Sequence, residues 1–176
     1  MAKPSDGQVP LVGIVMGSDT DFPVMSETGK MLDKFGISYE MEVLSAHRTP
    51  ARAHEYSTTA AGRGVKVIIA AAGAAAHLAG VMAANTILPV IGVPMATSTL
   101  QGLDALLATV QMPGGIPVGT MAIDKAGAVN AAIFAAEILA LSDPAVAGKL
   151  VEHKESMARG VTEKNARLQK QLSENK

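Results

Sequence analysis

The chain has 176 residues, a formal net charge of −1, 48% hydrophobic residues and only 3% aromatic residues. This charge and the scarcity of aromatic side chains argue against a nucleic-acid partner or an anionic membrane surface. Cysteine is absent, which excludes disulfides, thiolate nucleophiles and zinc or iron–sulfur sites ligated by cysteine.

Residues 1–9 are polar and carry no apolar region typical of a signal peptide. The longest weakly polar stretch, 65–84, is interrupted by Lys66 and His77, which favours strand, turn and helix over a membrane span. We therefore expect a cytoplasmic protein without a membrane partner.

Strand and helix patterns alternate five times along the chain. Strands are predicted at 11–16, 39–44, 65–71, 88–93 and 117–123. Helices are predicted at 23–35, 50–61, from the 72–80 loop to about 85, at 100–110 and at 127–141. The repeated order predicts a parallel sheet with helices on both faces and right-handed crossovers, for which the strand order 2-1-3-4-5 is favoured.

Single residues refine these predictions. Glu40 and Glu42 interrupt the apolar pattern of the second strand, which places it at or near a sheet edge. Gly36 is expected to end the first helix. Pro89 suits the start of the fourth strand and Pro94 its end.

Residues 144–172 predict a long C-terminal helix that follows the completed sheet. Its apolar residues recur at spacings of 4, 7, 4, 7 and 4, at Val146, Leu150, Met157, Val161, Leu168 and Leu172. An eleven-residue repeat of this kind stays on one face of a nearly straight helix. A helix appended in this way more often reaches a neighbouring subunit than its own domain.

The stretch Ser45-Ala46-His47-Arg48-Thr49-Pro50 joins the second strand to the second helix. His47 beside Arg48 pairs a proton carrier with an anion holder. Thr49 can cap the helix and Pro50 suits its first turn, so the helix N-terminus is expected to attract negative charge. A solvated surface loop is the alternative, and this stretch alone does not decide between the two.

The predicted topology brings this stretch together with two other loops. Ligands of such sheets bind beyond the carboxyl ends of the strands, where the strand order reverses. The loops that meet there are 17–22, 45–50 and 72–80, with the polar residues Ser18, Asp19, Asp21, Ser45, His47, Arg48 and His77. Hydroxyl and carboxylate groups suit ribose, an arginine with backbone N–H groups suits phosphate, and a histidine suits proton transfer. Together, the residues of the three loops predict that the ligand is a sugar phosphate or mononucleotide that undergoes an acid–base step.

Each motif also has a structural interpretation. The 17–22 loop lacks the spacing of dinucleotide and P-loop motifs and by itself predicts only a turn. His77 is slightly more typical of a hydrogen-bonded core histidine or a cap, and His54 and His153 are expected on solvated helix faces. His47 and His77 could bind a metal, but no H-x-x-x-H or H-E pairing supports one.

Several segments together resemble the 5-(carboxyamino)imidazole ribonucleotide mutase family. They run in order between Val12 and about Leu141: Met16-Gly17-Ser18-x-x-Asp21, Ser45 to Pro50, Gly73…His77-Leu78-x-Gly80, Gly92-Val93-Pro94 and Gln111 to Thr120. The resemblance implies a three-layer α/β/α flavodoxin-like fold with a catalytic domain at 1–143. It implies a C-terminal helix at 144–176 that packs on neighbouring subunits of a homo-octamer, and no cofactor or metal.

The resemblance also implies a reaction. It is the conversion of N5-carboxyaminoimidazole ribonucleotide to 4-carboxy-5-aminoimidazole ribonucleotide in purine biosynthesis, an isomerase reaction in which the enzyme holds CO₂ between two steps. By the same resemblance, His47 is the catalytic acid and base, Ser18 and Asp21 bind ribose, and Arg48 binds phosphate. The remaining implied substrate-binding residues are Ser45, Ala46, Gly73, Ala74, His77 and Leu78.

The chain departs from the family pattern at four positions. Ala71, Ala74 and Ala79 stand where members usually have Gly, Gly and Pro, and Asp124 stands where Gly is common. If position 74 requires a positive φ, its alanine costs about 1 kcal/mol.

Other functions remain as alternatives. One is the related aminoimidazole ribonucleotide carboxylase that uses free CO₂, but that branch tends to have Lys where this chain has Arg48 and lacks the Gln111–Gly115 pattern. Another is a flavodoxin-like protein that binds a nucleotide without chemistry, and a third is a flavin or nicotinamide protein. His47 favours catalysis, because a protein that only binds has no need of a proton carrier.

Overall fold

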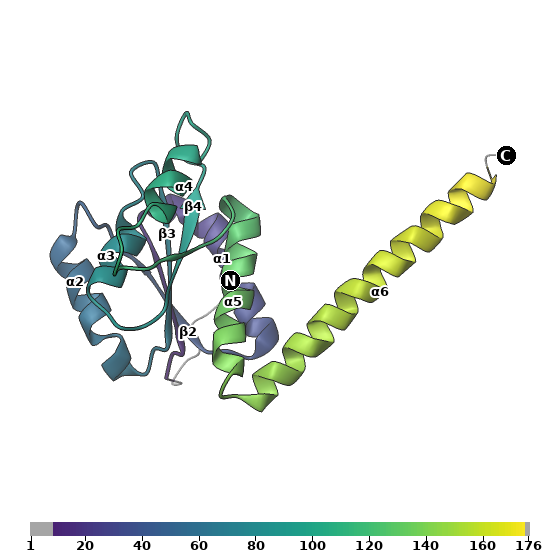
Figure 1. Ribbon diagram of the computed structural model, residues 1–176, viewed down its shortest axis with the longest axis horizontal. Helices are drawn as coiled ribbons and strands as arrows, with labels where there is room; N and C mark the ends of the chain where they lie inside the picture. The colour runs from purple at the N-terminus through teal and green to yellow at the C-terminus, as the bar shows by residue number, and fades with distance from the viewer. Residues whose placement is uncertain (1–8, 175–176) are drawn as a thin grey trace.

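The computed structural model describes residues 9–174, which form a five-stranded parallel sheet between two helical layers (Figure 1). The strands are β1 (Val12–Met16), β2 (Tyr39–Val43), β3 (Val67–Gly73), β4 (Val90–Met95) and β5 (Gly119–Thr120). Their order is β2-β1-β3-β4-β5, with all neighbouring pairs parallel. The predicted fold class and strand order are confirmed, and β2 lies at the sheet edge.

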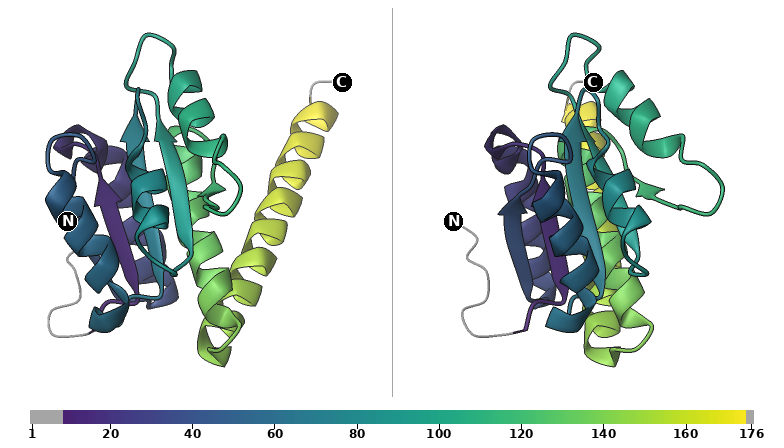
Figure 2. Two further views of the ribbon diagram at one scale, coloured as in Figure 1. Left: turned by 60° about the vertical axis from the view of Figure 1, so that its left-hand side comes forward. Right: turned by 90° about the vertical axis from the view of Figure 1, so that its left-hand side faces the viewer.

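The helices are α1 (Phe22–Phe35), α2 (Pro50–Thr59), α3 (Leu78–Ala84), α4 (Leu103–Val110), α5 (Asp124–Ala140) and α6 (Pro144–Glu174). Helices α1 and α5 cover one face of the sheet, and α2 and α3 cover the other (Figure 2). Every residue of β1 is buried, as its uninterrupted apolar run predicts. Gly36 ends α1 in the left-handed conformation, with φ of 66°.

The pairing of β1 with β2 and with β3 determines where the loops that follow these three strands emerge. Met16, at the end of β1, pairs with Val43 of β2 on one side and with Ala71 of β3 on the other. Because the strands are parallel, the loops that follow β1, β2 and β3 leave the sheet at the same edge. This is the edge at which the sequence predicted a ligand site.

The fourth and fifth strands differ from their predicted bounds. Strand β4 continues through Pro94, which pairs with Ala72, so the prediction that Pro94 ends the strand is wrong. The pairing of β4 with β5 reaches only Gly92 and Thr120, and β4 is therefore an edge strand at Pro94, where a missing N–H is tolerated. The same short pairing reduces β5 to two residues.

Helix α6 begins on its own domain and then leaves it. Val146, Leu150 and His153 are buried against α1 and α5, whereas the later stripe residues Met157, Val161, Leu168 and Leu172 are 50–66% exposed. Figure 1 shows the C-terminal half of α6 extending away from the sheet. None of the helices within residues 9–174 is long and apolar enough to cross a membrane.

The expectation that His153 lies on a solvated face is wrong. Its ring packs edge-on against Phe35, with centroids 5.5 Å apart, and its Nδ1 lies 3.0 Å from Lys34 Nζ. Burial, together with the Lys34 ammonium group, lowers the pKa of His153. The residue follows Leu150 by three positions on α6, so it lies on the same buried face.

Candidate active site

A cavity of about 310 Å³ lies at the carboxyl ends of β1 and β3, bordered by the loop that follows β2. Its walls come from four segments that are distant in the sequence. The lining residues are Gly17, Ser18, Thr20, Asp21, Ser45, Ala46, His47, Arg48, Ala72, Gly73, Ala75, Leu78 and Thr97. The strand order therefore brings the three predicted loops to one site.

The first wall is a turn held by Ser18 and Asp21. The Ser18 N–H donates to Asp21 Oδ2 at 3.2 Å, and Ser18 Oγ accepts from the Thr20 N–H at 3.3 Å, which together form a capping box. Asp21 is only 2% exposed. Burial raises its pKa, the hydrogen bond from Ser18 opposes this rise, and the carboxylates of Asp124 and Asp19 add to it. The site thus holds a carboxyl group in a fixed position.

His47 and His77 face each other beside the cavity. His47 Nε2 lies 2.8 Å from His77 Nδ1, and the two rings are nearly perpendicular, at 89°. One imidazole must donate to the other, so the contact restrains both rings. Both side chains are exposed, so the expectation that His77 is a core histidine is wrong. His77 does occupy the N-cap position of α3, but its side chain makes no capping hydrogen bond there.

Arg48 joins the second loop to the first. Its Nη2 donates to the Gly17 carbonyl oxygen at 3.0 Å, and its backbone N–H donates to Ser45 Oγ at 3.1 Å. Thr49 occupies the predicted N-cap position of α2, but its side chain does not cap the helix. Its hydroxyl instead accepts from the Ser45 N–H at 3.0 Å and donates to the Ser45 carbonyl at 3.1 Å. The threonine therefore closes its own loop, and the guanidinium is anchored at the cavity.

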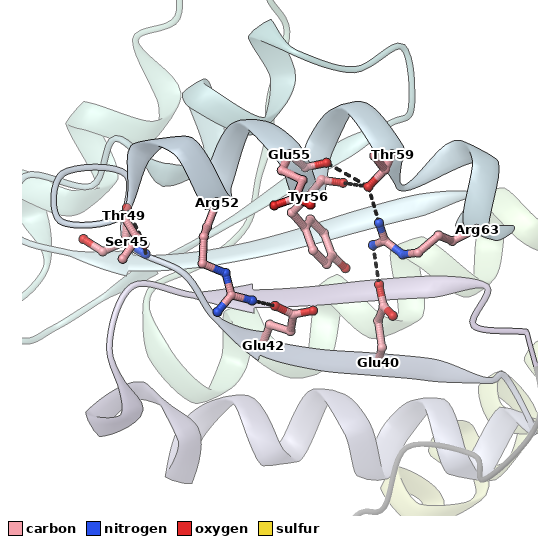
Figure 3. A network of polar contacts seen from close by, with 9 residues as sticks. All are labelled: Glu40, Glu42, Ser45, Thr49, Arg52, Glu55, Tyr56, Thr59 and Arg63. Carbon is pink, nitrogen blue, oxygen red and sulfur yellow. Dashed lines mark hydrogen bonds and ion pairs between the residues drawn. The ribbon is translucent and has the colours of Figure 1, made fainter.

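Ion pairs behind this loop hold α2 on the edge strand β2 (Figure 3). Arg52 pairs with Glu42 at 3.0 Å, and Arg63, in the turn after α2, pairs with Glu40 at 2.8 Å. The Arg63 guanidinium also lies over the Tyr56 ring, 4.7 Å from its centroid. Single exposed pairs contribute little stability, but two pairs and a stacked ring restrain α2, whose start carries the His47 loop.

The third wall comes from β3 and the loop that follows β4. A Cβ atom at Gly73 would overlap Thr97 Oγ1, so glycine is required for these two segments to approach. Ala74 has φ of 51°. Position 74 thus has a positive φ, and this strains the alanine by about 1 kcal/mol. Ala71 is fully buried in β3, and Ala79 is buried in the first turn of α3.

Asp19, Ala74 and His77 do not line the cavity, whereas all other predicted site residues do. His77 reaches the site only through its contact with His47. Sequence reasoning missed Thr20 and Thr97. Thr20 lies inside the predicted first loop. Thr97 follows the Gly92-Val93-Pro94 segment at the end of β4, and β4 is the strand beside β3, so the predicted strand order could have indicated Thr97.

Within residues 9–174, no three His, Asp or Glu side chains are grouped so that they could hold a metal ion. The site groups are instead the buried carboxyl of Asp21, the Arg48 guanidinium and the His47 imidazole, with His77 in contact with His47. These groups suit an anionic, hydroxylated ligand and a proton transfer.

Comparisons with known proteins find relatives along most of the chain. A Thermotoga maritima protein named N5-carboxyaminoimidazole ribonucleotide mutase is 56% identical over 161 residues, which cover 92% of this chain and 93% of that protein. A Bacillus subtilis protein of the same name is 53% identical over 159 residues, which cover 90% and 98%.

Solved structures with the same fold include a Treponema denticola PurE2 variant, with a TM-score of 0.83 and 27% identity over 92% of this chain and 99% of that chain. Treponema denticola PurE has a TM-score of 0.78 and 29% identity over 90% and 98%. The AIR carboxylase family matches residues 11–160. On the strength of this match and of relatives more than half identical along nearly their full length, the chain belongs to the AIR carboxylase family.

Proposed function

We propose that this chain is an N5-carboxyaminoimidazole ribonucleotide mutase, which forms 4-carboxy-5-aminoimidazole ribonucleotide in cytoplasmic purine biosynthesis. Curated relatives at 53–56% identity carry this name. The observation that carries the proposal is one cavity that joins His47, Arg48 and the Ser18–Asp21 turn. A proton carrier, an anion holder and hydroxyl-binding groups are what a ribonucleotide rearrangement requires.

The proposed binding roles follow from the charges around the cavity. Arg48 is anchored through Gly17 and Ser45, and its remaining N–H groups can hold the substrate phosphate. Ser18 and the buried carboxyl of Asp21 lie on the same wall and suit the ribose hydroxyls. The small, largely apolar wall at Ala46, Gly73 and Leu78 suits the flat imidazole ring and CO₂.

The proposed chemistry uses one proton twice. Protonated His47 donates to the exocyclic nitrogen as the carbamate C–N bond breaks, which yields CO₂ and aminoimidazole ribonucleotide. Carbon 4 of the ring then attacks CO₂ to form the new C–C bond, and neutral His47 removes the carbon 4 proton to restore aromaticity. The proton donated in the first step is recovered in the second, so the cycle needs neither a net proton nor an oxidant.

His77 supports this role by its contact with His47. The 2.8 Å approach restrains the His47 ring, which must meet first a nitrogen and then a carbon of the substrate. Closure of the cavity has to exclude water between these steps, because CO₂ must remain beside carbon 4.

The test is ultraviolet detection of 4-carboxy-5-aminoimidazole ribonucleotide after the protein is mixed with the carbamate substrate. We expect product above the spontaneous background, loss of turnover in His47→Asn with retained ribonucleotide binding, and an unchanged rate in His54→Asn. His54 is the matched control, since its ring bonds Asn85 on an exposed surface at 2.9 Å.

Three results would contradict the proposal. Absence of product above background removes the function, and a full rate in His47→Asn removes the acid–base assignment. Faster product formation from aminoimidazole ribonucleotide and CO₂ than from the carbamate would instead favour the carboxylase.

We also propose a homo-octamer in which residues 144–176 pack on neighbouring subunits of the catalytic domain 1–143. The exposed apolar stripe on α6 supports this assembly, since Met157, Val161 and Leu168 have no cover within the described chain. The first turns of α6 pack on their own domain, so the projecting part of the helix would make the contacts between subunits.

A further inference from the structure

The start of α5 lies next to the loop that follows β4. Asp124, the first residue of α5, is half-buried and has φ of 57°. Its Oδ1 accepts a hydrogen bond from the backbone N–H of Ala96, 2.8 Å away and 28 residues earlier in the chain. A left-handed φ is costly for a residue with a Cβ, although aspartate tolerates it better than most. Glycine would adopt this φ freely but would leave the Ala96 N–H without this acceptor.

Ala96 directly precedes Thr97, which lines the cavity. Thr97 packs closely on Gly73, because a Cβ placed at Gly73 would overlap Thr97 Oγ1 and lie 3.0 Å from Thr97 Cβ. Ala96 is also enclosed from the other side, where a Cβ at Gly102 would lie 3.2 Å from its Cα and 2.7 Å from Ile123 Cγ2. The position of Ala96 therefore sets the position of Thr97 at the cavity wall.

Asp124 also acts on a second residue of the cavity through its charge. Burial raises the pKa of Asp21, and the charge of Asp124 adds to this rise. Asp21 lines the cavity as Thr97 does.

We propose that Asp124 is a positioning residue of the active site, which holds Thr97 against Gly73 through its hydrogen bond to the Ala96 N–H. This role rests on the proposed mutase function, in which the Thr97–Gly73 wall helps to retain CO₂ beside the ring. When the wall loosens, CO₂ escapes after the carbamate C–N bond has broken and before carbon 4 attacks. The enzyme then releases aminoimidazole ribonucleotide and CO₂ in place of the carboxylated product.

Three substitutions at one position separate the hydrogen bond from the strain. Asp124→Gly removes both, Asp124→Ala removes only the acceptor, and Asp124→Asn keeps an acceptor oxygen on a residue that tolerates this φ. We expect Gly and Ala to lower the kcat for carboxylated product by about tenfold to a hundredfold, since small misplacements at a reacting centre have effects of this size. The fraction of substrate released as aminoimidazole ribonucleotide, above the spontaneous background, is expected to rise in both. Asn is expected to retain most of the wild-type kcat.

Lys125→Ala is the matched control, because Lys125 is adjacent in the chain and its exposed side chain pairs with Glu27 at 3.3 Å. It is expected to leave kcat and the product ratio unchanged. Asp124→Gly relieves backbone strain, so its urea unfolding midpoint is expected to equal or exceed that of the wild type while its activity falls. A purely structural role would make stability and activity fall together. Wild-type kcat and product ratio in Asp124→Gly would overturn the proposal, as would an Asn variant as impaired as Ala.

Hydrogen exchange at the Ala96 N–H separates failure of this role from failure of the mutase function. The hydrogen bond predicts slow exchange in the wild type and in Asn, and faster exchange in Gly and Ala. An inactive wild type with this exchange pattern would refute the mutase function while supporting the positioning of Ala96. Exchange that is equal in all four proteins would overturn the positioning role even in an active enzyme.

Discussion

At the scale of single residues, the cavity depends on one buried carboxyl group. Asp21 is 2% exposed, and its pKa is raised from the ordinary value of 3.8, chiefly by burial. At pH values between 3.8 and the raised pKa, Asp21 is protonated in a larger fraction of folded chains than of unfolded chains. The free energy of unfolding therefore decreases as pH rises through this window, and below 3.8 the contribution is constant. The folded chain is therefore less stable when Asp21 is ionised than when it is protonated.

This sign predicts the behaviour of Asp21→Asn. The amide keeps an acceptor oxygen for the Ser18 N–H but cannot ionise, so the variant is expected to gain stability over the wild type as pH rises from acidic to neutral. Urea unfolding midpoints across this pH range measure the difference. Asp19→Asn, on the same turn but exposed, is the control and should show little change. A wild-type advantage that grows towards neutral pH would contradict the assignment.

At the scale of elements, β1 and α2 approach so closely that only glycine fits between them. A Cβ at Gly13 would overlap the Tyr56 hydroxyl oxygen and lie 3.2 Å from Tyr56 Cζ. That hydroxyl is buried and meets no hydrogen-bond partner among residues 9–174. Burial raises the pKa of Tyr56 far above its usual value, so the hydroxyl remains neutral. The ring therefore acts as a spacer between the sheet and the helix that positions His47.

Gly13→Ala is expected to lower the free energy of unfolding by about 1–3 kcal/mol, which is typical of an overpacked core. Tyr56→Phe removes the colliding oxygen and an unpaired polar group, so alone it should change stability little. The double variant is expected to recover most of the loss, as urea unfolding of all four proteins would show. Additive effects of the two substitutions would mean that the two residues do not meet in this way.

At the scale of the whole molecule, α6 divides into a buried start and a projecting end. The projecting end carries Val161 and Leu168 on its apolar face, both at least 50% exposed. If this face is the contact between subunits, Val161→Glu with Leu168→Glu should dissociate the assembly, because two charges would be buried without partners. Sedimentation velocity measures the mass.

The matched control places the same two charges on the opposite side of α6, as Ala166→Glu with Ser173→Glu, and should keep the wild-type mass. An unchanged mass in the Val161→Glu and Leu168→Glu variant would show that this face does not hold the assembly together.

Patterns that are local in the chain were predictable. The strand and helix order, the left-handed stop at Gly36 and the edge position of β2 follow from hydrophobic periodicity and from residue-specific backbone preferences. The strand order then required the three loops to meet, and most of the predicted site residues line one cavity for that reason. The family could also be recognised from the sequence, because its motifs are contiguous segments.

Contacts between distant segments needed the tertiary structure. The Asp124–Ala96 hydrogen bond spans 28 residues, the His47–His77 contact spans 30, and Thr97 reaches the cavity because β4 lies beside β3. The burial of His153 and the continuation of β4 through Pro94 likewise depend on which element packs alongside. The sequence by itself determined which residues prefer each local conformation and which motifs are present. Packing decided which side chains meet, since a side-chain contact depends on the distance between elements and not on either element alone.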